Sequence, residues 1–467
     1  MSEQQGETEE KKKVDEENGS QLPRPGKCCG LDIHKKTCTA AIVSDDKQPI
    51  VLADLENTGP GMKYLYQKLV EEGCSTVVME STGSYWMGAY DYLELRGINT
   101  VLICPRSLKA VVGKKTDESD ASVLANMYRI GFFEPSYVPP RHIRELRSLT
   151  RRLEKITKMT SSVKNSIQSQ VNAFSTGVTA TYTDPFGLGG TKIMKALAAT
   201  IKQGESIDVE KIIVQLREEG LSKKRLECVE EMLRISFDPT SNGWLIEQGL
   251  ETLRGLDEQK ELLLDRIAKH IEQHPDLSRY TRVLMTMRGI ALVSAASIVA
   301  EMGDPTRFPS SKSVASYFGL APSIEQSGPK TVRGSITKAG SRHMRRILGQ
   351  IACVVCVRGD PHLKRWYAQI SKRRGKHVAK TALSRKILVI TWAMMRDNQT
   401  YTDPDQADST DQTLRRNKLR ELVKRSQQSE RSVSMWKAIQ RLATDKKLRA
   451  ELGLGRILPP GSTKPSK

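Results

Sequence analysis

Four carboxylates stand where strands or helices are expected to end or begin. Asp32 closes one apolar run, Glu80 closes another, and Asp117 and Asp120 open a helical stretch. The i, i+3 spacing places the last two on one helix face. Four acids at one sheet edge would repel one another unless divalent cations lay between them, as in two-metal phosphoryl transfer. The pattern therefore predicts Mg²⁺ bound by Asp32, Glu80, Asp117 and Asp120.

A plainer interpretation competes at each of these positions. Aspartate at a strand end or helix start often only caps backbone groups or complements the helix dipole. The combination of four acids with the order of the elements favours the metal site. His34 is expected to be a neighbour of the site and not a ligand, because Mg²⁺ prefers oxygen.

The elements that would position the acids occupy residues 27–140. Three strand-like runs come first, at 28–34, 37–43 and 49–53. A helix, strand, helix, strand and helix then follow in that order at 62–72, 76–79, 85–96, 99–103 and 118–130. Consecutive strands followed by this alternation predict a mixed sheet with helices on its faces. This part is therefore expected to be α/β, and the rest of the chain all-α.

Two long amphipathic helices are expected next, at 141–174 and 244–273. Apolar residues recur at helical spacing in the first, at Ile143, Leu146, Leu149, Leu153, Ile156, Val163, Ile167 and Val171. The simplest arrangement over 141–275 is an antiparallel helical arm with an insertion, 177–241, at its tip. Such a stripe usually marks a seam between helices, and we expect the arm helices to pair between subunits in a homo-oligomer, with an intramolecular hairpin as the alternative.

The charge of the chain points to a polyanionic partner. Its 467 residues carry 74 Lys and Arg against 54 Asp and Glu, a formal charge of +20. Much of the surplus lies between Lys330 and Lys386, where sixteen Lys and Arg accompany a single acid, Asp360. The aromatic residues there are few, so phosphate contacts are expected more than base stacking. A basic domain at 276–400, with helices separated by a loop at 322–340, should therefore bind nucleic acid.

The remaining features suggest a soluble protein of the prokaryotic cytoplasm. No run of about 18 apolar residues could span a membrane, and the acidic start is unlike a signal peptide. Residues 1–26 are expected to form a disordered tail and 401–467 a polar C-terminal extension. Cys353 and Cys356 lie in an apolar run without a second pair, which favours buried core thiols over a zinc site.

The acidic motifs resemble a known family. Asp32, Glu80 in Met-Glu-Ser-Thr-Gly, and the acids of Lys-Thr-Asp-Glu-Ser-Asp-Ala-Ser look like the DEDD domain of IS110-family insertion-sequence transposases. Residues 280–395 resemble the second domain of that family. The resemblance implies a ribonuclease H-like fold, similar to RuvC Holliday-junction resolvases, for residues 27–140. It also implies a recombinase guided by a structured bridge RNA, acting on donor and target DNA as a dimer or tetramer.

The resemblance also implies a catalytic serine shortly after Gly-Leu-Ala-Pro, which corresponds here to Ser327. The residues alone would not choose it over Ser335 or Ser341. Its hydroxyl would attack a DNA phosphodiester, although no nearby His and Asp pair offers a base. The cations that follow are expected to clamp phosphate, or alternatively to form a solvated helix face: Arg333, Lys338, Arg342, Arg345 and Arg346.

These inferences predict an insertion-sequence recombinase that cuts and rejoins DNA through a phosphoserine, with Mg²⁺ as cofactor. One alternative is a metal-dependent, structure-specific nuclease that uses water as the nucleophile. Another is a scaffold that binds RNA or DNA through the basic segment without catalysis.

Overall fold

A computed structural model describes residues 25–45, 47–80, 83–103, 117–132, 135–180, 184–201, 206–237, 243–327 and 330–402. The chain divides into two compact units, Met1–Val138 and Pro139–Lys467. The expected tail and C-terminal extension lie almost wholly outside the described residues. Within the described part, no helix is long and apolar enough to cross a membrane.

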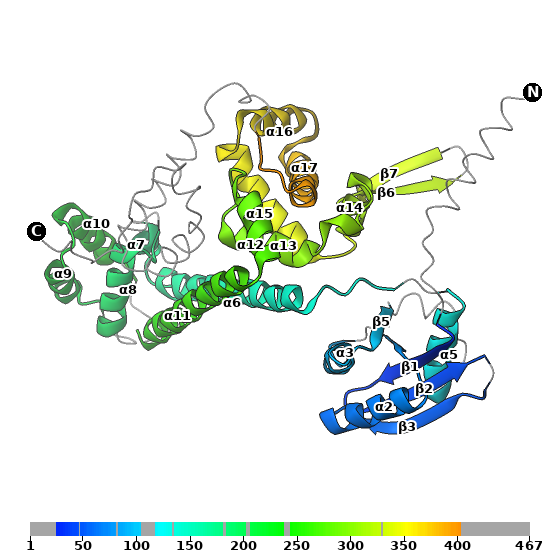
Figure 1. Ribbon diagram of the computed structural model, residues 1–467. Coiled ribbons are helices and arrows are strands. Elements are labelled where there is room, and N and C mark those ends of the chain that lie inside the picture. Colours follow the sequence, from blue (N-terminus) through cyan, green and yellow to red (C-terminus); the bar gives the residue numbers. More distant parts are fainter. Residues whose placement is uncertain are drawn as a thin grey trace, which may run out of the picture. The chain divides into compact units, whose positions relative to one another are not determined.

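The first unit is built on a five-stranded mixed sheet, which confirms the α/β expectation (Figure 1). Its strands, in the order β3-β2-β1-β4-β5 across the sheet, are β1 (Lys27–Ile33), β2 (Thr37–Ser44), β3 (Ile50–Glu56), β4 (Thr76–Glu80) and β5 (Asn99–Ile103). The first three strands pair antiparallel, whereas β1, β4 and β5 run parallel. Parallel pairing needs crossover connections, and the helices predicted between these strands supply them.

Helices cover both faces of this sheet. The helices α2 (Gly59–Glu71) and α3 (Trp86–Glu94) pack with Leu31, Val77 and Met79 on one face. The helix α5 (Asp117–Arg129) packs with Cys28 and Val78 on the opposite face. Side chains alternate along a strand, so each strand contributes to both cores, as its almost unbroken apolar sequence requires.

The second unit begins with the helical arm, an antiparallel pair of long helices. Helix α6 (Arg141–Asn172) lies along α11 (Trp244–Gln273). His142 meets His270 near one end, and a Cβ on Gly249 would touch Ile167 near the other. The tip holds α7 (Thr176–Ala180), α8 (Leu188–Thr200), α9 (Val209–Glu218) and α10 (Lys223–Arg234) around a core of its own.

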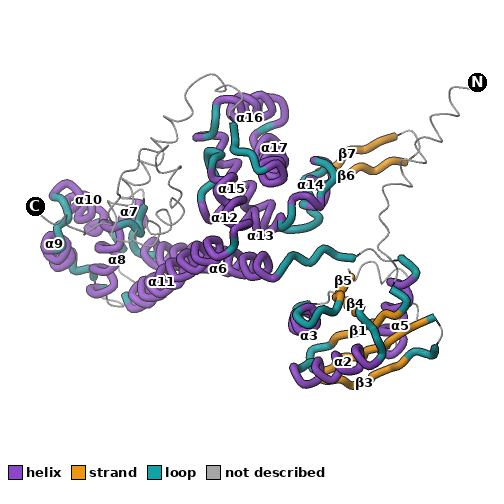
Figure 2. Tube along the Cα trace, in the orientation of Figure 1, coloured by secondary structure: helices purple, strands orange, loops and turns teal. Residues whose placement is uncertain are grey.

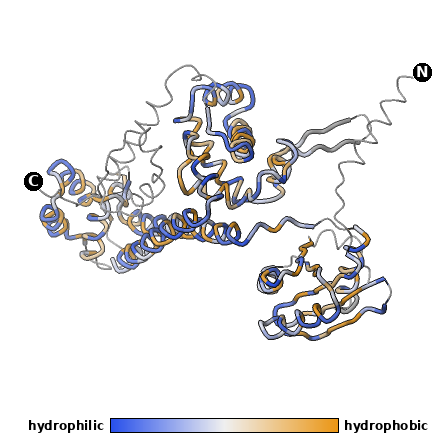
Figure 3. Tube along the Cα trace, viewed as in Figure 1, coloured by the Kyte–Doolittle hydropathy of each residue, from blue (hydrophilic) through white to orange (hydrophobic). Residues whose placement is uncertain are grey.

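The seam that we expected between subunits is thus a seam within one chain. The apolar residues of α6 and α11 are buried against each other and against neighbouring helices. In Figure 3 both helices are mostly blue with short orange stretches, as a narrow apolar stripe produces. The periodicity correctly located the buried face, but periodicity alone carries no information about which chain supplies the partner.

The rest of the unit is a helical domain around one core (Figure 2). Its elements are α12 (Pro275–Met285), α13 (Leu292–Met302), the short 3₁₀ helix η1 (Pro305–Arg307), α14 (Ser311–Tyr317), β6 (Pro322–Ser327), β7 (Lys330–Ile336), α15 (Arg342–Arg358), α16 (Pro361–Arg374) and α17 (Lys376–Asp397). Fully buried residues such as Phe318, Leu348 and Leu383 tie these helices together.

The expected loop at 322–340 is largely a β-hairpin, so that expectation was wrong. β6 and β7 pair antiparallel, with Ser327 opposite Lys330 and Pro322 opposite Ile336. Gly328 and Pro329 separate two short runs that contain β-branched residues, which is a hairpin signal. The polar residues between the apolar ones hid that signal.

The burial expected for Cys353 and Cys356 was also wrong. Cys353 is exposed and Cys356 is half-buried. The buried side of α15 carries Leu348, Ala352 and Val355, and Cys353 lies on another side. The run is apolar all round, so its sequence gives no sidedness.

Candidate catalytic centre and nucleic-acid interface

The register of two parallel strands brings Asp32 and Glu80 side by side. Leu31 of β1 lies opposite Met79 of β4, so the next residues on the two strands are Asp32 and Glu80. Cys28 and Val78, which have the same parity, pack on the side of α5. Both carboxylates therefore belong to the α5 face, at the edge where the parallel strands end.

Helix α5 brings a third carboxylate to the same face. A Cβ on Gly30 would lie 1.8 Å from the carbonyl oxygen of Ala121, so only glycine lets α5 approach β1 this closely. Asp120 precedes Ala121 and so lies close to β1. Its Oδ1 is buried and, among the described residues, has no hydrogen-bond partner. An ionised carboxylate oxygen in this position is costly unless a cation or a proton donor compensates it.

These donors fit a hard divalent cation by their chemistry. Mg²⁺ prefers oxygen ligands, and the carboxylates at the ends of these strands supply them. Asp117 lies three residues before Asp120 in α5, and its side chain is outside the described residues, as are residues 104–116. Within the described part, no three His, Cys, Asp or Glu side chains stand close enough together to hold a metal ion. His34 is mostly exposed, and its Nε2 lies 3.4 Å from Asp32 Oδ2.

Two buried thiols of this sheet, Cys28 near the start of β1 and Cys38 near the start of β2, have raised pKa values. Burial raises the pKa of Cys28 to about 12. Burial and the nearby negative charge of Asp32 raise the pKa of Cys38 to about 11. Only a thiolate is a good metal ligand or nucleophile.

Ser327 is at the turn end of the β-hairpin in the second unit. It is the last residue of β6, and Pro322 and Ile336 mark the opposite end, or base, of the hairpin. Figure 1 shows the two strands extending away from α14 and the other helices. The side chains of 324–333, including those of Ser327 and Arg333, lie outside the described residues.

The cations that follow Ser327 divide into two kinds. Lys338 and Arg342 are exposed. Arg345 instead donates from Nη1 to the carbonyls of Phe318, Ala339 and Gly340. Arg346 Nε lies 2.8 Å from Glu154 Oε1 of the arm. Two of the five predicted phosphate ligands therefore have partners inside the protein.

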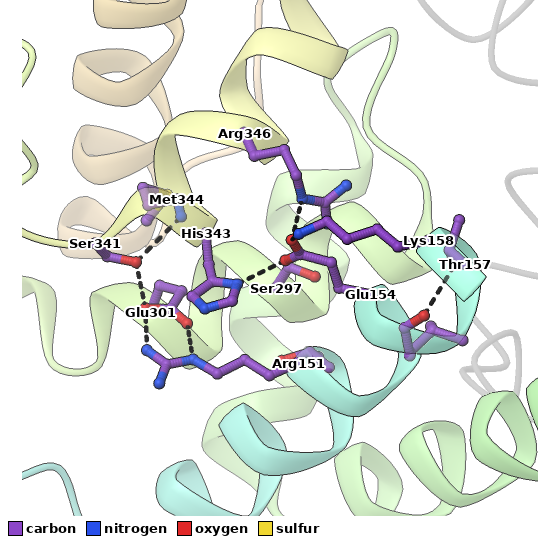
Figure 4. Close-up of polar contacts among 12 residues, drawn as sticks. Arg151, Glu154, Thr157, Lys158, Ser297, Glu301, Ser341, His343, Met344 and Arg346 are labelled. Atoms are coloured by element: carbon purple, nitrogen blue, oxygen red, sulfur yellow. Dashed lines mark hydrogen bonds and ion pairs between the residues drawn. The ribbon is translucent and has the colours of Figure 1, made fainter. Parts of the chain in front are cut away.

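A buried polar network that the sequence did not reveal joins α15 to the arm (Figure 4). Glu154 Oε2 lies 2.6 Å from His343 Nδ1, and Lys158 donates to Glu154 Oε1. Burial alone would raise the pKa of Glu154, but His343, Lys158 and Arg346 outweigh it and lower the pKa to about 2. The ligands of this carboxylate come from distant segments, so no local motif announces them.

A second buried carboxylate, Glu301 of α13, completes this junction. Arg151 of the arm contacts both of its oxygens, at 2.8 and 3.0 Å, and Ser341 donates to it at 2.7 Å. Burial opposes ionisation here too, yet Arg151 and Ser341 keep the pKa of Glu301 below its ordinary value. The start of α15 is thus fixed to both α13 and the arm.

The exposed cations gather at the turn between α16 and α17. Lys372, Arg373, Arg374 and Lys376 are all exposed there. Asp360, the single acid of the basic segment, is 2% exposed and accepts hydrogen bonds from Leu363 N and Tyr401 Oη. The segment therefore presents no acid of its own at the surface, which favours contact with a polyanion.

Two family models match the chain. A transposase model, the DEDD domain of IS110, matches residues 29–175, and a model of the IS116/IS110/IS902 transposase family matches residues 281–368. The chain belongs to the IS110 family of transposases. The first range contains the four acids, and the second contains Ser327 and the five cations discussed above.

Individual relatives match the chain in part or over most of its length. An uncharacterized 43.6 kDa protein of insertion element IS110 from Streptomyces coelicolor is 30% identical over 32% of this chain and 36% of its own length. A probable family 20 transposase from Pseudomonas aeruginosa is 29% identical over 32% of the chain and 46% of its length. A putative transposase, y4qE, from Sinorhizobium fredii is 22% identical over 80% of this chain and 89% of its own length.

Proposed function

We propose that this chain is an RNA-guided DNA recombinase of an insertion sequence, which cuts and rejoins DNA through a phosphoserine at Ser327. Asp32, Glu80, Asp117 and Asp120 would hold Mg²⁺ in a ribonuclease H-like, RuvC-like domain. The observation that carries the proposal is the buried Asp120 Oδ1, without a described partner, on the face that Asp32 and Glu80 share. Membership in the IS110 family supports it.

The covalent step conserves the energy of the phosphodiester. The Ser327 hydroxyl attacks the phosphorus, loses its proton, and forms a phosphoserine ester while the bond from phosphorus to one deoxyribose oxygen breaks. That oxygen takes up a proton and leaves as a strand end with a free hydroxyl. A hydroxyl end of another strand then attacks the phosphoserine and releases Ser327, so strands are exchanged without an external energy source.

The residues of the chain divide the remaining work. Bound Mg²⁺ would polarise the phosphodiester and help activate the serine hydroxyl. Asp32, Glu80 and Asp120 would hold the cation, and strand register and the Gly30 contact fix where these residues lie. Ser327 is the last residue of β6, at the turn end of a hairpin that extends away from the helices (Figure 1). The two sets of residues lie in different units of the chain.

The exposed cations of the second unit would bind the backbone phosphates of donor and target DNA. The turn between α16 and α17 and the residues Lys338 and Arg342 are available for this. Trp366 and Tyr367 pack partly into the core, which supports phosphate contact over base stacking. A structured guide RNA and a dimer or tetramer of the chain enter the proposal from the family resemblance.

The test is to trap the reaction on a nicked DNA substrate and to map any DNA-linked peptide by mass spectrometry. We expect an adduct at Ser327 that needs Mg²⁺ and disappears in Ser327→Ala and in Asp120→Asn. Ser335→Ala is the matched control, because it removes an exposed hydroxyl from the other strand of the same hairpin. It should form the adduct as the unchanged protein does.

Other outcomes would refute specific parts of the proposal. Mg²⁺-dependent cutting without any adduct would identify a nuclease that uses water. Nucleic-acid binding without cutting, in the presence of the RNA that copurifies with the protein, would leave only a scaffold.

A further inference from the structure

At the base of the β6–β7 hairpin, here called the serine hairpin because Ser327 ends β6, two backbone segments lie close together. They are residues 317–321 and 337–340. Thr337 N donates to Ala321 O, and Lys338 N donates to Gly319 O, so pairing continues past the ends of β6 and β7. Gly319 and Gly340 both have positive φ angles, +66° and +72°. A Cβ on either would lie about 2 Å from a backbone oxygen, at 2.1 Å from Ala339 O and 2.0 Å from Tyr317 O respectively.

Arg345 ties both of these segments to helix α15. Its Nη1 lies 3.2 Å from Phe318 O, before β6, and 2.7 Å from Ala339 O and 3.2 Å from Gly340 O, after β7. Phe318 is fully buried, and it ends α14. These carbonyls lie where helix and strand pairing stop, so a cationic donor satisfies acceptors that regular structure leaves over.

The hairpin acts as a lever on the position of Ser327. Six residues of β6 span roughly 17 Å, so a tilt of about 10° at the base would move Ser327 by about 3 Å. Catalysis tolerates far less, because a misplacement of about 1 Å can cost about a hundredfold in rate. The orientation of the base therefore decides whether the serine can reach its phosphate.

We infer that Arg345 is a positioning residue, which orients the base of the hairpin and through it Ser327, and is not a ligand for nucleic-acid phosphate. This inference rests on the proposed function, in which Ser327 is the nucleophile. The first turn of α15 also contacts α13 and the arm. Ser341 donates to Glu301 of α13, and His343 and Arg346 contact Glu154 of the arm. Through α15, the hairpin base is thus connected to the junction of α13, α15 and the arm.

The experiment compares Arg345→Met with Arg342→Met and Arg345→Lys in the full-length protein. Arg342→Met is matched because it removes one positive charge from the same turn, but from an exposed side chain. Hydrogen exchange of peptides covering 319–340, measured without nucleic acid, reports the hairpin base directly. The rate of adduct formation at saturating DNA and the DNA dissociation constant are measured separately.

For Arg345→Met we expect exchange in 319–340 to become about tenfold faster. The adduct rate at saturating DNA should fall by about ten- to a hundredfold, with the dissociation constant and the exchange of α13 and α17 unchanged. Arg342→Met should weaken binding and leave hairpin exchange alone. Arg345→Lys should recover part of the rate, because its ammonium offers three donors to the same carbonyls.

Three results would overturn the inference. The first is exchange in 319–340 of Arg345→Met that matches the unchanged protein, and the second is a loss of protection that extends equally through α13 and α17. The third is a weaker DNA affinity with an unchanged adduct rate, which would make Arg345 a phosphate ligand. A wild-type protein that forms no Ser327 adduct would defeat the proposed function instead, and the exchange data would still decide whether Arg345 holds the hairpin.

Discussion

The acids on the α5 face of the sheet and Ser327 on the β-hairpin are positioned by different means. Asp32 and Glu80 inherit theirs from the register of neighbouring strands, and Asp120 from a helix that lies against Gly30. Ser327 stands at the turn end of a two-stranded hairpin whose described fixed points lie at its base. Pairing with neighbouring strands fixes the position of a carboxylate in the sheet, whereas the tip of a hairpin moves whenever the orientation of its base changes.

The acids and the serine should therefore be sensitive to substitutions at different places. Substitutions near the acids should act through the metal or through the packing of α5. Substitutions near the serine should act at a distance, through Arg345 and the junction with the arm.

The largest effect is expected at Asp120. Asp120→Asn should lower Mg²⁺-dependent strand cleavage by about a thousandfold, because a bound cation supplies several kcal/mol of charge stabilisation. Glu71→Gln, which removes an exposed carboxylate at the end of α2, is the control and should cleave normally. Thermal unfolding sharpens the test. Mg²⁺ should stabilise the unchanged chain, whereas Asp120→Asn should be insensitive to it and at least as stable as the unchanged chain without metal.

The next effect tests whether packing holds the acids. Gly30→Ala places a Cβ 1.8 Å from Ala121 O, so α5 must move away from β1 at a cost of about 3 kcal/mol. Hydrogen exchange of β1 and β4 would measure the loss, and cleavage should fall with it. Gly88→Ala in α3 meets no atom within 4 Å and should be neutral or stabilising. Equal behaviour of the two variants would contradict the close packing at Gly30.

The sequence predicted the sheet better than it predicted the second unit. Apolar runs with turn residues between them located every strand of the first unit, and the acids at their ends marked the common edge. The prediction went no further than a mixed sheet, and the strand order and the parallel pairs came from the structure. The RNase H-like assignment, in contrast, came from resemblance and stays a proposal.

The second unit was harder to predict because its decisive contacts join distant residues. Arg345 and Arg346 have the composition of a phosphate-binding run, yet their partners are carbonyls before the hairpin and a glutamate of the arm. A charged residue on a helix face gives no sign of a buried partner from another segment. The hairpin was missed because its side chains are mostly polar, and the chain identity of the arm seam because periodicity does not specify it.

A smaller, pH-dependent effect is expected at the junction of α15 with the arm. The folded-state pKa of Glu154, about 2, lies below its ordinary value of 4.5. The ionised carboxylate therefore stabilises the fold above about pH 4.5, by about 3 kcal/mol at neutral pH, and this stability is lost as the pH falls toward 2.

Unfolding curves of Glu154→Gln and the unchanged chain between pH 2 and pH 7 would measure this contribution. The two should differ most near neutrality and converge toward pH 2. Glu251→Gln removes a carboxylate from an exposed ion pair with Arg254 on α11 and should show no such dependence. A gap between Glu154→Gln and the unchanged chain that stays constant with pH would mean that packing, and not charge, is what Glu154 contributes.

The smallest effect separates two sets of exposed cations, those at the turn between α16 and α17 and those on α10. Arg373 and Arg374 are exposed at the turn between α16 and α17, so Arg373→Gln with Arg374→Gln should leave thermal stability unchanged. If both contact duplex phosphates, the slope of log affinity against log salt should fall by about 0.9 for each, or about 2 together.

The matched control is Lys223→Gln with Lys224→Gln, which removes two adjacent exposed cations from α10, a helix that also carries Glu227, Glu230 and Glu231. That control should keep the full slope, because nearby acids already offset those charges. A slope that falls equally in both double variants would mean that net charge governs binding, and the turn would lose its standing as a nucleic-acid contact.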